Sequence, residues 1–148
     1  MIKKYVSFCL ILFFFSSATS IAAKKVLIDT DPGVDDAQAV VFAFASPDLE
    51  VVGLTTIFGN VATPLATQNA LRLLDIVGAD VPVAEGAIKP IYSKRLPIPD
   101  FVHGKDGFGE INLPPSKRRA IDETAAEFIV RTVMDNPGEI TLVVLGPM

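Results

Sequence analysis

Short apolar runs alternate with longer segments of helical periodicity along most of this chain. Four runs have the continuous apolar character of buried strands, and they lie at residues 25–29, 49–56, 81–84 and 140–145. Between them, apolar positions recur at helical spacing over residues 35–45, 61–77 and 121–135. Strands that are apolar on both faces and alternate with helices are typical of a parallel sheet covered on both sides. The pattern predicts an α/β fold with a Rossmann-like, open, mostly parallel sheet and helices on both faces.

The first 23 residues follow a different pattern. Lys3 and Lys4 precede an apolar stretch over residues 5–15, and small residues follow up to Ala23. This is the layout of a secretory signal peptide, and the apolar stretch is too short for a membrane-spanning helix. We therefore expect a signal peptide at residues 1–23, a domain at residues 24–148, export to the periplasm or the medium, and no membrane anchor after cleavage.

Charge and cysteine content narrow the class of partner. The formal net charge of the chain is −4, and removing Lys3 and Lys4 with the signal peptide makes it −6. An acidic domain argues against nucleic acids and anionic membranes as partners. The only cysteine, Cys9, lies inside the predicted signal peptide. The exported domain therefore has to be held by an ordinary packed core without disulfides.

The stretch "LIDTDPGVDDAQAV" concentrates negative charge where the first strand gives way to the first helix. Its four aspartates are Asp29, Asp31, Asp35 and Asp36. Residues 26–71 contain no lysine or arginine, and two carboxylates about 4 Å apart repel by roughly 4 kcal/mol at an effective dielectric constant of 20. The helix N-terminus offsets part of this repulsion, but capping needs only one or two aspartates. A divalent cation accounts for the rest, and oxygen ligands favour calcium or magnesium over zinc.

Other polar residues follow the remaining predicted strands. In open parallel sheets, ligands bind at the carboxyl ends of the strands. Besides the first two aspartates, the residues expected there are 55–60, Glu85, Gly86 and 145–147. The sequence therefore predicts one ligand site at this edge of the sheet.

The residues alone leave several alternatives open. Asp35 and Asp36 after a Pro-Gly turn also fit a plain helix cap. An EF-hand fits poorly, because Gly33 and Val40 stand where oxygen ligands are expected. A phosphatase of the haloacid dehalogenase type shares the spacing of the first two aspartates, but Gly33 stands where that class has Thr or Val. Asn60 also suits a left-handed turn, and a lone loop histidine such as His103 is often simply exposed.

Several segments together resemble the inosine-uridine preferring nucleoside hydrolase family. They are "KKVLIDTDPGVDDAQAV", "VVGLTTIFGNV", "PVAEGAIKPI", "HGKDGFGE" and "ITLVVLGPM". The similarity spans essentially all of the predicted domain. It implies a hydrolase that uses water to cleave the N-glycosidic bond of ribonucleosides, purine or pyrimidine, to free base and ribose.

The resemblance also implies roles for individual residues. Asp31, Asp36 as a bidentate carboxylate, and the backbone carbonyl of Leu145 match the ligands of one calcium ion. Asp31 also matches the base that activates the attacking water. Asp35 and Asn60 match positions that hold the ribose hydroxyls.

Two further positions match the family, and the resemblance also implies how the chain assembles. Asp29 matches a supporting acid, and His103 matches the substrate-binding region near the base. Relatives continue beyond the position of Met148 with a half that supplies another aspartate ligand and a histidine. The resemblance therefore implies a sheet truncated after the fourth strand, with little or no activity alone, and a homo-oligomer at full length. A nucleoside- or ribose-binding remnant without catalysis is the alternative.

Overall fold

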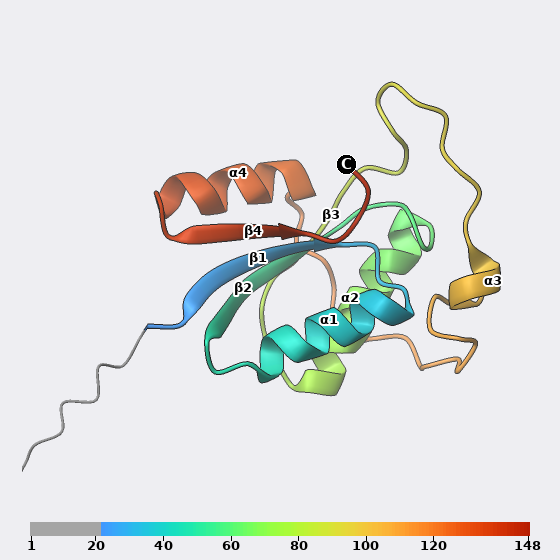
Figure 1. Cartoon of the computed structure of the whole chain (residues 1–148), viewed down its shortest axis with the longest axis horizontal. Helices are drawn as coiled ribbons and strands as arrows, with labels where there is room; N and C mark the ends of the chain where they lie inside the picture. The colour runs from blue at the N-terminus through green and yellow to red at the C-terminus, as the bar shows by residue number, and fades with distance from the viewer. Residues whose placement is uncertain (1–21) are drawn as a thin grey trace, which may run out of the picture.

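The computed structural model describes residues 22–148, so the predicted signal peptide lies almost wholly outside the described residues. Four parallel strands form one sheet in the order β3-β2-β1-β4 (Figure 1). The strands are β1 (Lys24–Thr30), β2 (Leu49–Thr56), β3 (Val83–Glu85) and β4 (Ile140–Val144). The predicted open parallel sheet is confirmed.

Helices cover both faces of the sheet. The helices are α1 (Val34–Ala45), α2 (Thr63–Val77), the single-turn α3 (Asp100–His103) and α4 (Ala125–Asp135). In Figure 1, α1 and α2 lie on one side of the sheet and α4 lies on the other. This two-sided cover explains why the strands read as continuous apolar runs.

Successive residues of β1 supply the two faces in turn. Val26 and Ile28 pack in the apolar cluster shared with α1 and α2, whereas Leu27 packs in the cluster shared with α4. All three side chains are buried. A strand at the centre of the sheet therefore needs an apolar residue at every position, not at every second one.

The side of the sheet under α4 depends on one close approach. Phe128 is 3% exposed, and a Cβ added at Gly53 on β2 would lie 2.7 Å from its ring. Burying a Phe side chain contributes roughly 1.5–3 kcal/mol. Gly53 thus leaves the space into which the main apolar side chain of α4 packs.

The helix predicted over residues 121–135 begins later than the periodicity indicates. Thr124 caps α4, because its Oγ1 accepts a hydrogen bond from the backbone N–H of Glu127 at 3.3 Å while the Glu127 carboxylate accepts from the backbone N–H of Thr124 at 2.9 Å. The N–H of Ile121 instead donates to the carbonyl of Val83 at 2.9 Å. The backbone there forms an isolated parallel bridge with Ala84 of β3 and is not helical.

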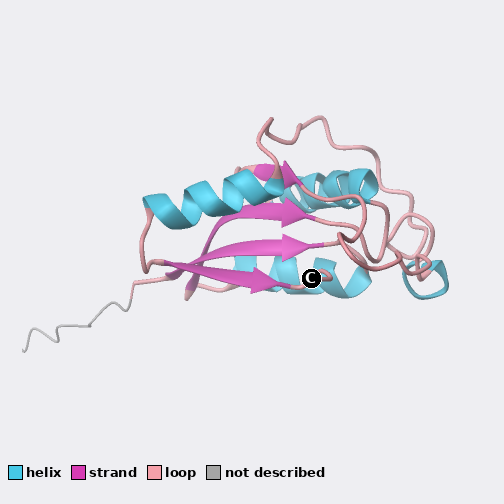
Figure 2. Cartoon of the chain, turned by 90° about the horizontal axis from the view of Figure 1, so that it is seen from above, coloured by secondary structure: helices cyan, strands magenta, loops and turns pink. Residues whose placement is uncertain are grey.

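The carboxyl ends of all four strands point the same way, and the long loops gather beyond them (Figure 2). The long connection between β3 and α4 contains α3 at this end. At the sheet edge, Leu142 and Val144 of β4 are each about two-fifths exposed. No helix within residues 22–148 combines the length and apolarity needed to span a bilayer.

Candidate cation and ribose site

The loops that follow all four strands enclose a pocket of about 610 Å³, and the connection after β3 supplies residues within 90–99 to its lining. Asp31, Asp35, Asp36, Asn60 and Leu145 all line it. Residues that lie up to 114 positions apart in the chain therefore meet at one edge of the sheet, as the strand order requires. The ligand site predicted at the carboxyl ends of the strands corresponds to this pocket.

Asn60 joins the two aspartates predicted as metal ligands. Its backbone N–H donates to Oδ2 of Asp31 at 2.6 Å, and its side-chain Nδ2 donates to Oδ2 of Asp36 at 2.8 Å. Gly59 permits this approach, because any Cβ there would overlap the Asp31 carboxylate. Among the described non-glycine residues, positive φ angles occur only at Glu110 and Asn112. The alternative of Asn60 as a left-handed turn residue is therefore wrong.

The neighbouring Asp35 and Asp36 have opposite environments. Asp36 is 4% exposed, and its Oδ1 accepts a hydrogen bond from the Thr30 hydroxyl at 2.5 Å. The Asp35 side chain is 76% exposed and faces the pocket. Adjacent helical residues point about 100° apart, so one carboxylate lies beneath the pocket while the other is open to a ligand. A plain helix cap does not explain this arrangement.

Asp29 lies deeper and links the end of β1 to the ends of β2 and β4. It is buried, and its Oδ1 accepts a hydrogen bond from the Thr55 hydroxyl at 2.6 Å. Its backbone carbonyl accepts from the N–H of Leu145 at 2.8 Å. Burial raises the pKa of Asp29, and the Thr55 hydrogen bond lowers it in part. Asp29 thus supports the site from below and fixes the backbone that carries Leu145.

The electrostatics of the pocket centre on Asp31. Burial raises its pKa to about 7, with the Asn60 N–H opposing the rise and the charge of Asp36 adding to it. Among the described residues, no lysine, arginine or histidine forms an ion pair with Asp31 or Asp36. The two buried carboxylates are held only by neutral donors, and Lys94 and Arg95 line the same pocket without pairing with them.

The donor set suits a hard cation. In the part of the chain that the structure describes, no three His, Cys, Asp or Glu side chains converge as a metal-binding group. The predicted set of two carboxylates and the Leu145 carbonyl does not require three such side chains. All of its donors are oxygen atoms that line one pocket, as calcium and magnesium prefer. The residues present therefore fit such an ion.

His103 is buried. The alternative of a lone, exposed loop histidine is therefore wrong. His103 is 7% exposed, and its Nδ1 accepts a hydrogen bond from the N–H of Val34 at 3.3 Å. The same nitrogen lies 3.7 Å from Oδ1 of Asp35. The loop that carries His103 is thus held against the start of α1, beside the pocket.

Sequence reasoning missed the hydroxyl donors of the site. Thr30 and Thr55 are fully buried and hold Asp36 and Asp29 respectively. Both stand near the ends of apolar strands, in "LIDT" and "LTT". A hydroxyl residue at the buried carboxyl end of a strand, beside an acidic cluster, is the signal that could have identified them.

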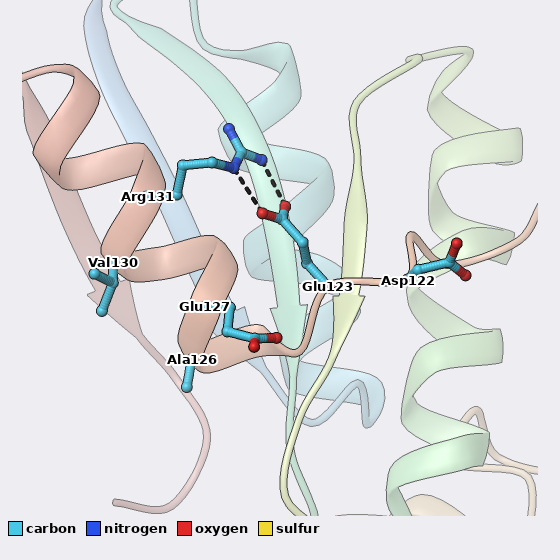
Figure 3. Close-up of a pocket in the computed structure, with 6 residues that line it drawn as sticks. All are labelled: Asp122, Glu123, Ala126, Glu127, Val130 and Arg131. Atoms are coloured by element: carbon cyan, nitrogen blue, oxygen red, sulfur yellow. Dashed lines mark hydrogen bonds and ion pairs between the residues drawn. The ribbon is translucent and has the colours of Figure 1, made fainter.

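A second hollow lies beside α4, on the other side of the sheet (Figure 3). Three of its four charged side chains are already paired. Arg131 binds both carboxylate oxygens of Glu123, at 2.8 and 2.7 Å, and Glu127 is used in the cap of α4. These contacts account for those three side chains, and the pocket at the strand ends remains the candidate site.

Comparison with known proteins agrees with this geometry. Residues 26–148 match the family model described as inosine-uridine preferring nucleoside hydrolase. A probable uridine nucleosidase 2 of Arabidopsis thaliana is 55% identical over 127 residues, which cover 84% of this chain and 39% of that protein. Enzymes of this family depend on a metal ion.

Solved structures show the same relationship. A plant nucleoside hydrolase, the PpNRh1 enzyme, has a TM-score of 0.80 and 52% identity over 84% of this chain and 40% of its own. A purine-preferring ribonucleoside hydrolase of Gardnerella vaginalis has a TM-score of 0.79 and 34% identity over the same shares. The chain spans about 40% of the length of these relatives. This match decides against the phosphatase alternative, and the chain belongs to the inosine-uridine preferring nucleoside hydrolase family.

Proposed function

We propose that these residues form the cation- and ribose-binding part of a nucleoside hydrolase. The reaction is the cleavage of the N-glycosidic bond of a ribonucleoside by water, giving free base and ribose. The observation that carries the proposal is Asn60, which hydrogen-bonds two buried carboxylates at once in a pocket of about 610 Å³. That volume lies in the range of small-molecule sites, roughly 300–1,000 Å³.

The cation of this proposal is calcium. Asp31, Asp36 and the backbone carbonyl of Leu145 would hold it. A bound calcium ion lowers the pKa of a coordinated water and anchors neighbouring hydroxyl groups. The support is two buried carboxylates that have no ion-pair partner among the described residues and a donor set made only of oxygen.

The other site residues have distinct tasks in the proposal. Asp31 accepts the proton of the attacking water, since its buried carboxylate lies in the pocket where the cation would bind. Asp35 and Asn60 hold the ribose hydroxyls, since Asp35 projects its exposed carboxylate into the pocket. Positive charge develops on the ribose ring as the bond breaks, and the surrounding carboxylates stabilise it. Asp29 keeps the base of the pocket in place.

His103 marks the side of the site where the base binds. Its loop lies against the start of α1, next to Asp35. The relative at 55% identity is named a probable uridine nucleosidase, and uridine is therefore the substrate that we propose. We also propose export by the predicted signal peptide and a homo-oligomeric full-length protein.

The proposal is tested by measuring binding and turnover on the same sample. The melting temperature of the calcium-loaded chain should rise with ribose, and Asp35→Asn should abolish this rise. Asp48→Asn, an exposed acid away from the pocket, is the matched control and should retain it. Uracil release from uridine, followed by chromatography, reports turnover. Ribose protection supports the proposed site, and its absence contradicts both hydrolysis and the binding-only alternative. Uracil release would favour hydrolysis over binding alone, and rapid release would contradict the expectation that this chain has little activity by itself.

A further inference from the structure

We infer that Asn69 is a positioning residue that fixes the His103 loop against the loop carrying the cation ligands. The inference rests on the proposed function for its consequence, but not for its geometry. The His103 loop comprises residues 103–112, and the aspartate loop comprises residues 31–36. Asn69 itself lies on α2 and does not line the pocket.

Both hydrogen-bond donors of the Asn69 amide group are directed at this junction. The side chain is fully buried. Its Nδ2 donates to the carbonyl of Pro32 at 3.1 Å and to the carbonyl of Asp106 at 2.9 Å. Its Oδ1 accepts a hydrogen bond from Nη1 of Arg72 at 2.8 Å, which fixes the orientation of the amide. One side chain therefore holds one carbonyl from each loop.

Hydrogen bonds to Asp106 hold the His103 loop together as one compact structure. The Asp106 carboxylate accepts hydrogen bonds from the backbone N–H groups of Phe108, Glu110 and Asn112 at 2.9, 2.7 and 3.0 Å. Gly107 lets the loop approach closely, since a Cβ there would lie 2.7 Å from Asn69 Nδ2. Holding the carbonyl of Asp106 thus positions the whole loop.

Both ends of this connection reach the candidate site. Pro32 directly follows the cation ligand Asp31, and Val34, two residues on, donates its N–H to Nδ1 of His103. Asn69 therefore sets the distance between the cation ligands and His103 without touching either. Loss of its two donors should let the His103 loop shift away from the aspartate loop.

The chain contains a single histidine, so the position of His103 can be followed directly. In protein labelled with ¹⁵N at histidine, an Nδ1 that accepts a hydrogen bond requires the neutral tautomer with its proton on Nε2. The unsubstituted chain should show this tautomer at alkaline pH. Asn69→Leu, and the equally sized Asn69→Asp that lacks both donors, should give the averaged signals of a free imidazole. Gln68→Leu, on the same helix, is the control and should retain the native signals.

A measurement on the unsubstituted chain covers the case in which these variants do not fold. The two Nδ2 protons of Asn69 should exchange with solvent at least about a hundredfold more slowly than those of an exposed asparagine. Rapid exchange of these protons, or native His103 signals in a folded Asn69→Leu, would overturn the inference. A calcium titration separates the two proposals. If calcium does not bind but the His103 signals respond to Asn69→Leu, the positioning role stands and the proposed function fails.

Discussion

The backbone N–H of Asn60 donates to Oδ2 of Asp31 over 2.6 Å, although the two residues lie 29 positions apart. The contact exists because β1 and β2 are parallel neighbours, so the loops that follow them emerge at the same edge of the sheet. The Asn60 side chain then reaches Asp36. This pairing sets the separation of the two carboxylates that define the pocket, and the predictions below start from it.

Asn60→Ala should lower the stability of the metal-free chain. The change removes the hydrogen bond to the buried Asp36 carboxylate but keeps the backbone bond to Asp31. We expect the free energy of unfolding without calcium to fall by roughly 1.5–3 kcal/mol, as for hydrogen bonds to charged groups. Saturating calcium should restore part of this loss, because a cation compensates the same carboxylate.

Urea unfolding with calcium and with chelator measures both quantities. Asn136→Ala removes an amide that donates to the Thr132 carbonyl at the end of α4, and its effect should not depend on calcium. An equal loss for Asn60→Ala with and without calcium would contradict the link between Asn60 and the cation.

The raised pKa of Asp31 predicts how stability changes with pH. Its pKa of about 7 in the folded chain exceeds the ordinary value of 3.8, so the folded state binds the proton more tightly than the unfolded state. The stabilisation from this group is fully present below the unfolded pKa and is lost as pH rises through about 7. Without calcium, the free energy of unfolding should therefore fall between about pH 4 and pH 7, by at most about 4 kcal/mol.

Asp31→Asn should flatten this dependence, and Asp48→Asn should leave it unchanged. Calcium and the proton compete for the same carboxylate, so calcium affinity should rise over the same pH range. Denaturation curves at several pH values with chelator present test the first expectation. A slope that persists unchanged in Asp31→Asn would assign the titration to another group.

Gly59→Ala should damage the site more than the fold. The added Cβ would overlap the Asp31 carboxylate, and the side chain or its loop has to move. We expect calcium affinity to fall at least about tenfold, equivalent to about 1.4 kcal/mol. Gly138→Ala places a Cβ in open space at a positive φ. This control should lose roughly 1 kcal/mol of stability from backbone strain and keep native calcium affinity.

Gly53→Ala tests the packing of α4 on the sheet. A Cβ at this position would lie 2.7 Å from the Phe128 ring, and overpacking of this kind costs about 1–3 kcal/mol. Phe128→Leu removes the clashing ring atoms, so the double variant should lose less stability than the sum of the two single variants. Urea unfolding of all four chains completes the cycle. Strictly additive losses would show that the two residues do not meet.

Much of the architecture could be predicted from the sequence because hydrophobic periodicity carries it. The run over residues 49–56 is a strand over those same residues, and the acidic stretch falls at the carboxyl end of β1 as parallel topology requires. The start of α4 could not be read from periodicity. Ile121 is apolar and in phase with the helix, yet its N–H pairs with Val83, and a tertiary hydrogen bond of this kind leaves no local signal.

Some residues of the site could likewise be predicted from the sequence, and others could not. Asp31 and Asp36 stand out because unpaired acidic residues are rare in buried segments. Asn69 does not stand out, because an asparagine in a helix carries no sign that its amide will hold carbonyls 37 positions away in either direction. Such residues are identified only when the loops that they join are seen together.

We propose that Asp31 and Asp36 form one cation site at the carboxyl edge of the sheet, and calorimetric titration of the chain with calcium tests for this site directly. We expect one ion per chain, lost in both Asp31→Asn and Asp36→Asn and retained in Asp122→Asn, which alters the hollow beside α4 instead. If the unsubstituted chain binds no calcium, or if binding survives both substitutions in the pocket, Asp31 and Asp36 do not form a cation site.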